Sequence, residues 1–126
     1  MASESIPILI VEPNAAERTV LNRELQRAGF EPAAAAGSQD AQARLGQEGG
    51  FRALVSADEL PDGDGIELVK AAGRMAPGLP VIIVSACGTV ARAVAAMQAG
   101  ACDYLMRPLA DGALAGAVRQ ALGAVA

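Results

Sequence analysis

The chain has 126 residues, with 10 lysine or arginine residues, 14 aspartate or glutamate residues and a net charge of −4. This length suits one domain with a single hydrophobic core, and we expect residues 1–126 to form it. The acidic balance argues against a nucleic-acid surface, and the apolar residues form no run long enough to span a membrane. Histidine, the commonest metal ligand and general base, does not occur in the chain.

The cysteines and the amino-terminal residues bear on location. Cys87 and Cys102 are typical of reduced thiols, and no charged-then-apolar leader precedes a cleavage site. We therefore expect a cytoplasmic protein. No basic residue adjoins Cys87 to activate its thiol, so we expect that thiol to be inert.

Short apolar runs alternate with helical patterns along the chain. The predicted strands are residues 8–11, 31–36, 53–56, 81–84 and 104–106. The unbroken apolar run at residues 81–84 is typical of a central strand covered on both faces, and Pro32 places the second strand at a sheet edge.

Helical patterns separate and follow these strands. The first covers about residues 15–28 with Val20 turned inward, and the second covers residues 38–46 with Ser38 as its cap. A third follows the loop at residues 57–65. The fourth helix has an apolar stripe that we expect to face inward: Val90, Val94, Met97 and Ala101. The last helix begins after its cap, Asp111, and we expect Val125 to face inward. Five strands alternating with five helices predict an α/β fold, a doubly wound parallel sheet with helices on both faces.

Two segments carry recognisable motifs. One is LPDGDGIEL at residues 60–68, and the other spans residues 80–108, with Ser85-Ala86, AxxAGA at 96–101 and DYLMRP at 103–108. In this order they resemble the receiver domains of two-component response regulators, with most similarity to nitrogen-regulator-type, sigma-54-dependent activators. The resemblance covers essentially the whole chain. It implies a flavodoxin-like receiver fold with strand order 2-1-3-4-5, and a signalling role in a phosphorelay and in transcription regulation, not an enzyme.

The resemblance also identifies the positions that carry receiver chemistry. A working receiver has two acids after strand 1 that hold Mg²⁺, a phosphoryl-accepting aspartate after strand 3, and a Ser/Thr and a Lys after strands 4 and 5. The matching residues here are Glu12, Pro13, Ala57, Ser85 and Arg107, of which only Ser85 is usual. The family's metal and ammonium neutralise phosphate oxygens. This set therefore implies a phosphorylation-incompetent pseudo-receiver with no catalytic residue, no metal ligand set and no cofactor, and Mg²⁺ binding is expected to be weak or absent.

Asp58 leaves a competent receiver open as the alternative. Counting back from Pro61 puts the acceptor position at Ala57, and neighbours in a strand face opposite sides. Only a local bulge would re-aim Asp58 to accept a phosphoryl group from a histidine kinase. Ser85 and Tyr104 match the family's switch residues. Equally, Ser85 could be a strand-end hydroxyl bonded to backbone, and Tyr104 a half-buried ring.

Other ligand classes fit the sequence less well. The acidic loop at residues 58–64 could suggest Ca²⁺, but it lacks the 12-residue ligand pattern, so a solvated turn is the better interpretation. A flavin or cobalamin carrier would need a hydroxyl-rich loop after strand 1 or a histidine ligand, and the chain has neither.

The resemblance implies protein partners, either a histidine kinase or an output domain. It also implies a homodimer or partner contact through the fourth helix, the fifth strand and the last helix. We expect this face to carry Arg92, Gln98, Asp103, Arg119 and Gln120. We expect no contact with nucleic acid or membrane through this domain. Within the vacated site, we predict that Arg107 pairs with Glu12 or Asp58, because a guanidinium makes a two-pronged bond to a carboxylate.

Overall fold

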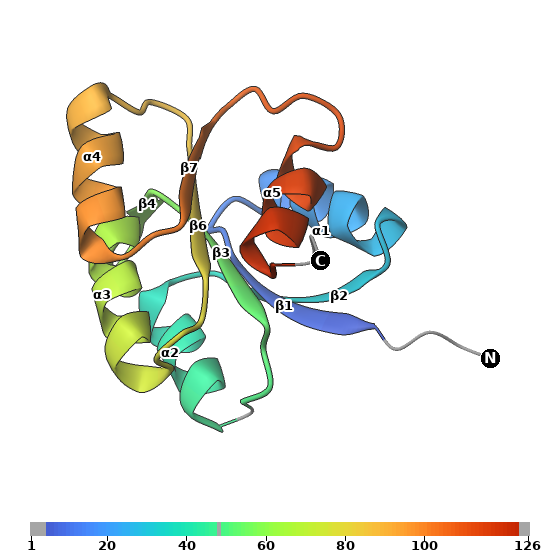
Figure 1. The fold of residues 1–126 in the computed structure, drawn as a ribbon, viewed down its shortest axis with the longest axis horizontal. Helices are drawn as coiled ribbons and strands as arrows, with labels where there is room; N and C mark the ends of the chain where they lie inside the picture. The colour runs from blue at the N-terminus through green and yellow to red at the C-terminus, as the bar shows by residue number, and fades with distance from the viewer. Residues whose placement is uncertain (1–4, 48, 124–126) are drawn as a thin grey trace.

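Five parallel strands form one sheet with helices on both sides (Figure 1). The structure is a computed structural model that describes residues 5–47 and 49–123. The strands of the sheet are β1 (Ile6–Val11), β2 (Phe30–Ala35), β3 (Ala53–Ala57), β6 (Val81–Ser85) and β7 (Asp103–Met106). The helices are α1 (Ala15–Arg27), α2 (Ser38–Gln47), α3 (Gly65–Met75), α4 (Val90–Ala99) and α5 (Ala113–Ala121).

The strand order is β2-β1-β3-β6-β7, with every neighbouring pair parallel. Since β6 and β7 are the fourth and fifth strands of the sheet in sequence, the predicted order and the flavodoxin-like fold are confirmed. Pro32 lies on the edge strand β2, as predicted. β6 is flanked by β3 and β7 and fully buried, although the middle strand is β3. The loop after β3 contains a short antiparallel hairpin, β4 (Glu59–Leu60) and β5 (Gly63–Asp64), which the sequence did not predict.

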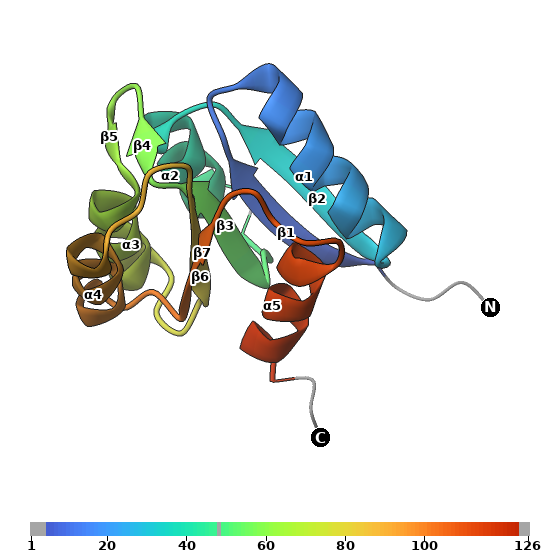
Figure 2. The same ribbon diagram turned by 90° about the horizontal axis from the view of Figure 1, so that it is seen from above.

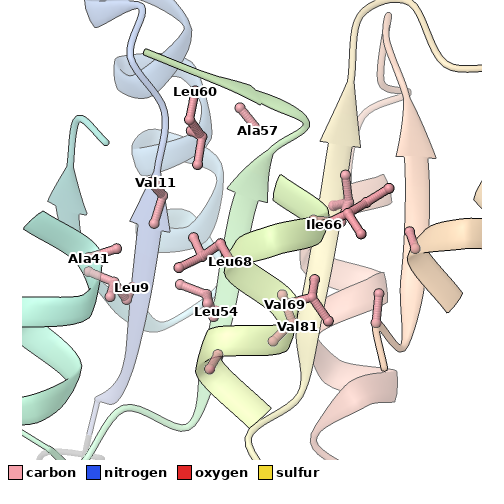
Figure 3. Close-up of a cluster of buried hydrophobic side chains, with 14 of the residues drawn as sticks. Leu9, Val11, Ala41, Leu54, Ala57, Leu60, Ile66, Leu68, Val69 and Val81 are labelled. Carbon is pink, nitrogen blue, oxygen red and sulfur yellow. The ribbon is translucent and has the colours of Figure 1, made fainter. Parts of the chain in front are cut away.

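The two faces of the sheet carry separate hydrophobic cores. In β1, Leu9 and Val11 join the cluster beneath α2, α3 and α4, while Ile8 and Ile10 join the cluster beneath α1 and α5. Figure 3 shows the first cluster, and Figures 1 and 2 show α1 and α5 together on the opposite side from α2, α3 and α4. Within the described ranges, no helix has the length and hydrophobicity that crossing a membrane requires.

Three of the four predicted inward residues of α4 are wrong, whereas Ala101 is buried as predicted, although it lies beyond the end of the helix at Ala99. Val90, Val94 and Met97 are 82%, 48% and 46% exposed, and buried Ala96 and its neighbouring alanines pack on the core instead. In an alanine-rich helix two apolar faces are available, and periodicity alone does not decide which one packs on the sheet. Val20 of α1 is likewise exposed, at 58%.

Two predicted helix caps are also wrong. The residue that precedes α5 is Gly112, at φ 78°, so Asp111 lies outside the cap position and no side chain caps that helix. Ser38 is already the first residue of α2. The backbone N–H groups of Ser38 and Gln39 donate instead to the carboxylate of Asp62, at 2.8 and 2.9 Å. Val125 lies outside the described residues.

Candidate functional site

The carboxyl ends of the strands meet at one edge of the sheet, and polar residues follow them there. Glu12 follows β1, Asp58 follows β3, Ser85 ends β6 and Arg107 follows β7. Ligand sites of open parallel sheets lie at this edge. The four side chains line a cavity of about 600 Å³, together with Pro13 and Ala57. The prediction that Glu12, Ala57 and Arg107 meet at one end of the sheet is therefore confirmed.

One half of the cavity is closed by an ion-pair cluster around Arg107. Its guanidinium donates to Glu12 Oε1 at 3.2 Å and to Glu17 Oε1 at 2.5 Å. The other carboxylate oxygen of Glu12 accepts the backbone N–H of Asn14 at 3.0 Å. The predicted Arg107–Glu12 pair is thus present, whereas Asp58 has a different partner. Since the side chains of Arg107 and Glu12 are 18% and 8% exposed, this pair is screened less than a surface ion pair.

The other half is organised around the carboxylate of Asp58, which is 5% exposed. Arg92 of α4 reaches it with two nitrogens: Nη2 bonds Oδ1, and Nε bonds Oδ2 at 3.3 Å. The hydroxyl of Tyr104 donates to Oδ2 at 2.8 Å. Arg92, which we expected on the partner face, therefore turns its guanidinium to Asp58, and its side chain remains 36% exposed. Because β3 ends at Ala57, Asp58 lies beyond the strand, where strand alternation no longer fixes its direction.

These contacts set the ionisation of the group. Burial acts to raise the pKa of Asp58, but hydrogen bonds from Arg92 and Tyr104 and the charge of Arg92 outweigh it, so the pKa lies below its ordinary value. The same pairing with Asp58 raises the pKa of Arg92. Burial raises the pKa of Tyr104. The site therefore holds an ionised carboxylate against a permanently charged guanidinium at neutral pH.

Close packing fixes the position of Tyr104. A Cβ atom at Gly88 would lie 2.7 Å from Oη and from Cε1 of Tyr104, so this ring needs glycine beneath it. Ser85 lies next to the ring and is 3% exposed. Its hydroxyl accepts the backbone N–H of Cys87 at 3.3 Å and lies close enough to Asp58 to help lower the pKa of that carboxyl group. Ser85 is thus satisfied by backbone, yet it also belongs to the Asp58 cluster.

The sequence of residues 8–119 matches the family profile described as "Response regulator receiver domain". This chain is a receiver domain. It is 27% identical to a CheY-like receiver domain protein from Methanospirillum hungatei JF-1, over 96% of each chain and with a TM-score of 0.89. A putative response regulator from Chloroflexus aurantiacus J-10-fl is 28% identical over 95% of this chain and 99% of that one, with a TM-score of 0.89.

A third solved structure supports the fold alone. It is the beryllofluoride-activated NtrC4 receiver domain dimer, at 23% identity over 95% of this chain and 98% of that chain, with a TM-score of 0.88. A search of curated protein sequences gave no match to the chain.

The residues of this receiver do not fit the Mg²⁺ that the family implies. Pro13 and Ala57 carry no carboxylate, and both oxygens of Glu12 already accept hydrogen bonds. Arg107 places a positive charge beside Glu12, where it would repel a divalent cation. Within residues 5–47 and 49–123, no three acidic or cysteine side chains gather into a group that could hold a metal ion.

Two residues of the receiver site were missed by sequence reasoning, and the contacts of a third residue, Asp62 in the nearby acidic loop, were not predicted. Glu17 is the second partner of Arg107, and Arg92 is the main partner of Asp58. Asp62 ties the loop after β3 to the start of α2. Arg92 did carry a signal, because a cation in the first turn of a helix opposes the helix dipole and calls for a nearby acid. The solvated-turn interpretation of the acidic loop was incomplete, since Asp62 caps α2 and Asp64 accepts the N–H of Glu67 in α3 at 2.8 Å.

Proposed function

We propose that this receiver domain is a pseudo-receiver, which signals through protein contacts and not through an aspartyl phosphate. It is a signalling module and not an enzyme, it uses no cofactor, and its affinity for Mg²⁺ is weak or nil. A nitrogen-regulator-like pathway with an output in transcription regulation belongs to the same proposal, as does a cytoplasmic location.

The observation that carries this proposal is the engagement of Asp58. Ala57 occupies the acceptor position, so Asp58 is the nearest carboxylate that could take its place. Phosphoryl transfer needs a carboxylate oxygen that is free to approach phosphorus in line with the leaving group. Arg92 bonds both oxygens of Asp58, and Tyr104 adds a bond to Oδ2. The carboxylate therefore faces α4 and β7, where it already has its counter-ion.

The same contacts suggest how the domain is kept in one conformation. In the family, metal, hydroxyl and ammonium groups surround the phosphate at this edge of the sheet. Here Asp58 binds the loop after β3 to α4 through Arg92 and to β7 through Tyr104. Arg107 binds the loop after β7 to the loop after β1 and to α1. Two internal ion-pair clusters thus take the place of the metal and phosphate that bind reversibly in the family. The domain therefore presents the same surface to its partner at all times.

Treatment with acetyl phosphate and Mg²⁺, followed by intact mass measurement, tests the proposal. We expect no covalent phosphoryl group on the wild-type chain. The positive control is the variant Pro13→Asp/Ala57→Asp/Arg107→Lys, which restores the family's residues and should gain one phosphoryl group. A mass gain on the wild-type chain that disappears in Asp58→Asn would refute the proposal and establish the competent alternative.

That alternative, a receiver phosphorylated on Asp58 by a histidine kinase, has one observation in its favour. The depressed pKa keeps Asp58 ionised at neutral pH, and Ser85, at the family's hydroxyl position, lies beside it. Phosphorylation would require Arg92 to release the carboxylate. The alternative therefore predicts that Arg92→Met increases labelling by acetyl phosphate, whereas the pseudo-receiver predicts no labelling of either protein.

We also propose that α4, β7 and α5 form the face that contacts protein partners, either a second copy or an output domain or kinase. The support is the exposed apolar stripe of Val90, Val94 and Met97 on α4, together with Met106 of the neighbouring strand β7, which is 51% exposed. Exposed apolar side chains on one face are typical of protein contacts. The similarly folded NtrC4 receiver was solved as a dimer. No nucleic-acid or membrane contact is proposed for this domain.

Sedimentation equilibrium tests the dimer. We expect Val94→Asp/Met97→Asp to shift the protein toward monomer, while Met75→Asp, an exposed methionine changed in the same way on α3, leaves assembly unchanged. A reversed order of effects, or cross-links confined to α1 and α2, would count against this face.

A further inference from the structure

A second cavity, remote from the strand-end site, lies between α1 and α5 on the other face of the sheet. It has a volume of about 480 Å³. Three arginines line it, Arg23 and Arg27 from α1 and Arg119 from α5, and all three are exposed. We call this cavity, as defined by these three arginines, the basic groove.

The basic groove is unusual for this chain. The protein has a net charge of −4 and only 10 basic residues, of which three lie here. None of the three forms an ion pair with any carboxylate in the described part of the chain. By contrast, the guanidinium groups of Arg92 and Arg107 are both used inside the fold. Since Glu24 and Asp111 also line the cavity, the three arginines leave it with one positive charge in excess, and no arginine of the groove is held by an ion pair with another described residue.

Helix stability explains only part of this arrangement. Arg27 and Arg119 lie in the last turns of their helices, where a cation interacts favourably with the helix dipole. Arg23 lies mid-helix, four residues before Arg27, and like charges at that spacing destabilise a helix. Folding therefore supplies no reason for Arg23 to be basic, while an anionic partner would.

The geometry of the groove is fixed by the fold. Glu24 accepts the backbone N–H of Ala115 at 3.0 Å and so joins α1 to the start of α5. Both helices follow strands of one parallel sheet, and Arg27 and Arg119 line the same cavity between them. Figure 2 shows α1 and α5 on this face, away from α3 and α4. The arginines thus project from a preorganised pair of helices, which reduces the entropic cost of binding.

The groove also carries features that select among anions. Glu24 and Asp111 line it as well, and Val20, 58% exposed, adds an apolar contact. A nucleic acid is uniformly charged and would meet both carboxylates. A polypeptide can place acidic side chains against the arginines, an apolar side chain against Val20, and neutral residues near Asp111. Guanidinium groups are suited to this, since they bind carboxylates through two parallel hydrogen bonds.

We infer that the basic groove between α1 and α5 binds an acidic segment of a partner protein, with carboxylates on Arg23, Arg27 and Arg119 and an apolar residue on Val20. This adds a class of partner to the proposed pseudo-receiver and does not depend on its phosphorylation state. Binding and phosphoryl mass are separate measurements, so either proposal can fail alone.

Fluorescence anisotropy with a labelled glutamate-rich peptide tests the inference. The probe is a helix-forming peptide with glutamates at i and i+4 and one central leucine, titrated with the full chain at physiological salt. We expect Arg23→Glu/Arg119→Glu to weaken binding by about tenfold or more, which corresponds to roughly 1.4 kcal/mol. The matched control is Arg52→Glu/Arg74→Glu, which changes the net charge equally at arginines outside the groove, and it should retain the wild-type affinity within about threefold, because salt screens distant charges.

Several results would overturn the inference. One is equal weakening by the groove and control variants, which would indicate a net-charge effect. Another is tighter binding of a short DNA duplex than of the peptide, which would favour nucleic acid. A third is self-association of the free protein that Arg23→Glu abolishes, which would assign the groove to a second copy. Amide chemical shifts of the wild-type protein provide a check that needs no variant: the peptide should perturb residues of α1 and α5, and perturbations elsewhere would refute the site.

Discussion

Replacing Arg92 with methionine tests the central contact of the site. The substitution keeps the length and the apolar stem of the side chain but removes the charge, so Asp58 stays buried with only Tyr104 and Ser85 as partners. The side chain of Asp58 is 6% exposed and that of Arg92 is 36% exposed. The pair therefore lies between a buried ion pair, whose disruption costs about 3–5 kcal/mol, and a surface pair, worth about 0–1 kcal/mol.

Loss of the Arg92–Asp58 pair should therefore cost an intermediate amount, about 2 kcal/mol. Removing a cation from the first turn of α4 relieves an unfavourable interaction with the helix dipole and offsets about 0.5 kcal/mol of this cost. We expect Arg92→Met to lower the free energy of unfolding by about 1.5 kcal/mol at pH 7, and the melting temperature by about 5 °C. Urea denaturation followed by circular dichroism measures the first quantity. The control is Arg74→Met, an arginine in the last turn of α3 without an ion pair among the described residues, which should change stability by less than about 0.5 kcal/mol.

The pH dependence separates the charge effect from lost packing. Because the pKa of Asp58 is lowered in the folded state, its stabilising effect is complete above the unfolded value of about 3.9 and is lost as the pH falls through the folded value. The cost of Arg92→Met should therefore be largest at pH 7 and should shrink below about pH 4. A cost that is the same at pH 3 and pH 7, or one no larger than that of Arg74→Met, would refute the reasoning.

Three further predictions concern the surroundings of the site. Gly88→Ala should displace the ring of Tyr104 from Asp58 and so reduce the burial that raises the pKa of Tyr104. The phenolate absorbance of Tyr104, the only tyrosine, should then titrate at lower pH than in the wild-type protein. The control is Gly73→Ala, whose Cβ would meet open space, and an unchanged titration in Gly88→Ala would argue against the packing. Arg107→Ala should lower the free energy of unfolding, measured by urea denaturation, by about 1 kcal/mol. If the variant is as stable as the wild-type protein, the ion pairs of Arg107 with Glu12 and Glu17 are solvated in the folded protein. Asp62→Ala should lower the melting temperature at pH 7, because hydrogen bonds from the N–H groups of α2 lower the pKa of Asp62 and stabilise its ionised form. This deficit should shrink as the pH falls below the unfolded value of about 3.9, and a deficit that does not change with pH would point to a loss of packing instead.

The fold could be predicted because its signals are strong and repeated. Unbroken apolar runs mark the buried strands, and Pro32 marks an edge. These features decide the order of elements without reference to any contact between distant residues. Side-chain direction was harder to predict in α4, where alanines offer a second apolar face and Val90 and Val94 proved exposed.

The site could be predicted in position but only partly in its bonding. Strand ends converge in any parallel sheet, so Glu12, Asp58 and Arg107 were expected near one another. Which cation would take which carboxylate depends on the reach of side chains from different elements. Arg92 lies 34 residues after Asp58, and it reaches the site because α4 begins just beyond β6. No local sequence pattern predicts the contact between Arg92 and Asp58. The one indication is a positive charge in the first turn of α4, where a cation interacts unfavourably with the helix dipole.

The edges of the sheet limit how this domain can associate. An exposed strand edge offers unpaired backbone groups to any extended chain, which is a route to strand addition and aggregation. At one edge β2 contains Pro32, which has no N–H to donate, and at the other edge β7 has only four residues. Backbone pairing with another chain is therefore unfavourable at both sides. Specific contacts are left to side chains on the helical faces, where a single substitution can change the choice of partner without disturbing the sheet.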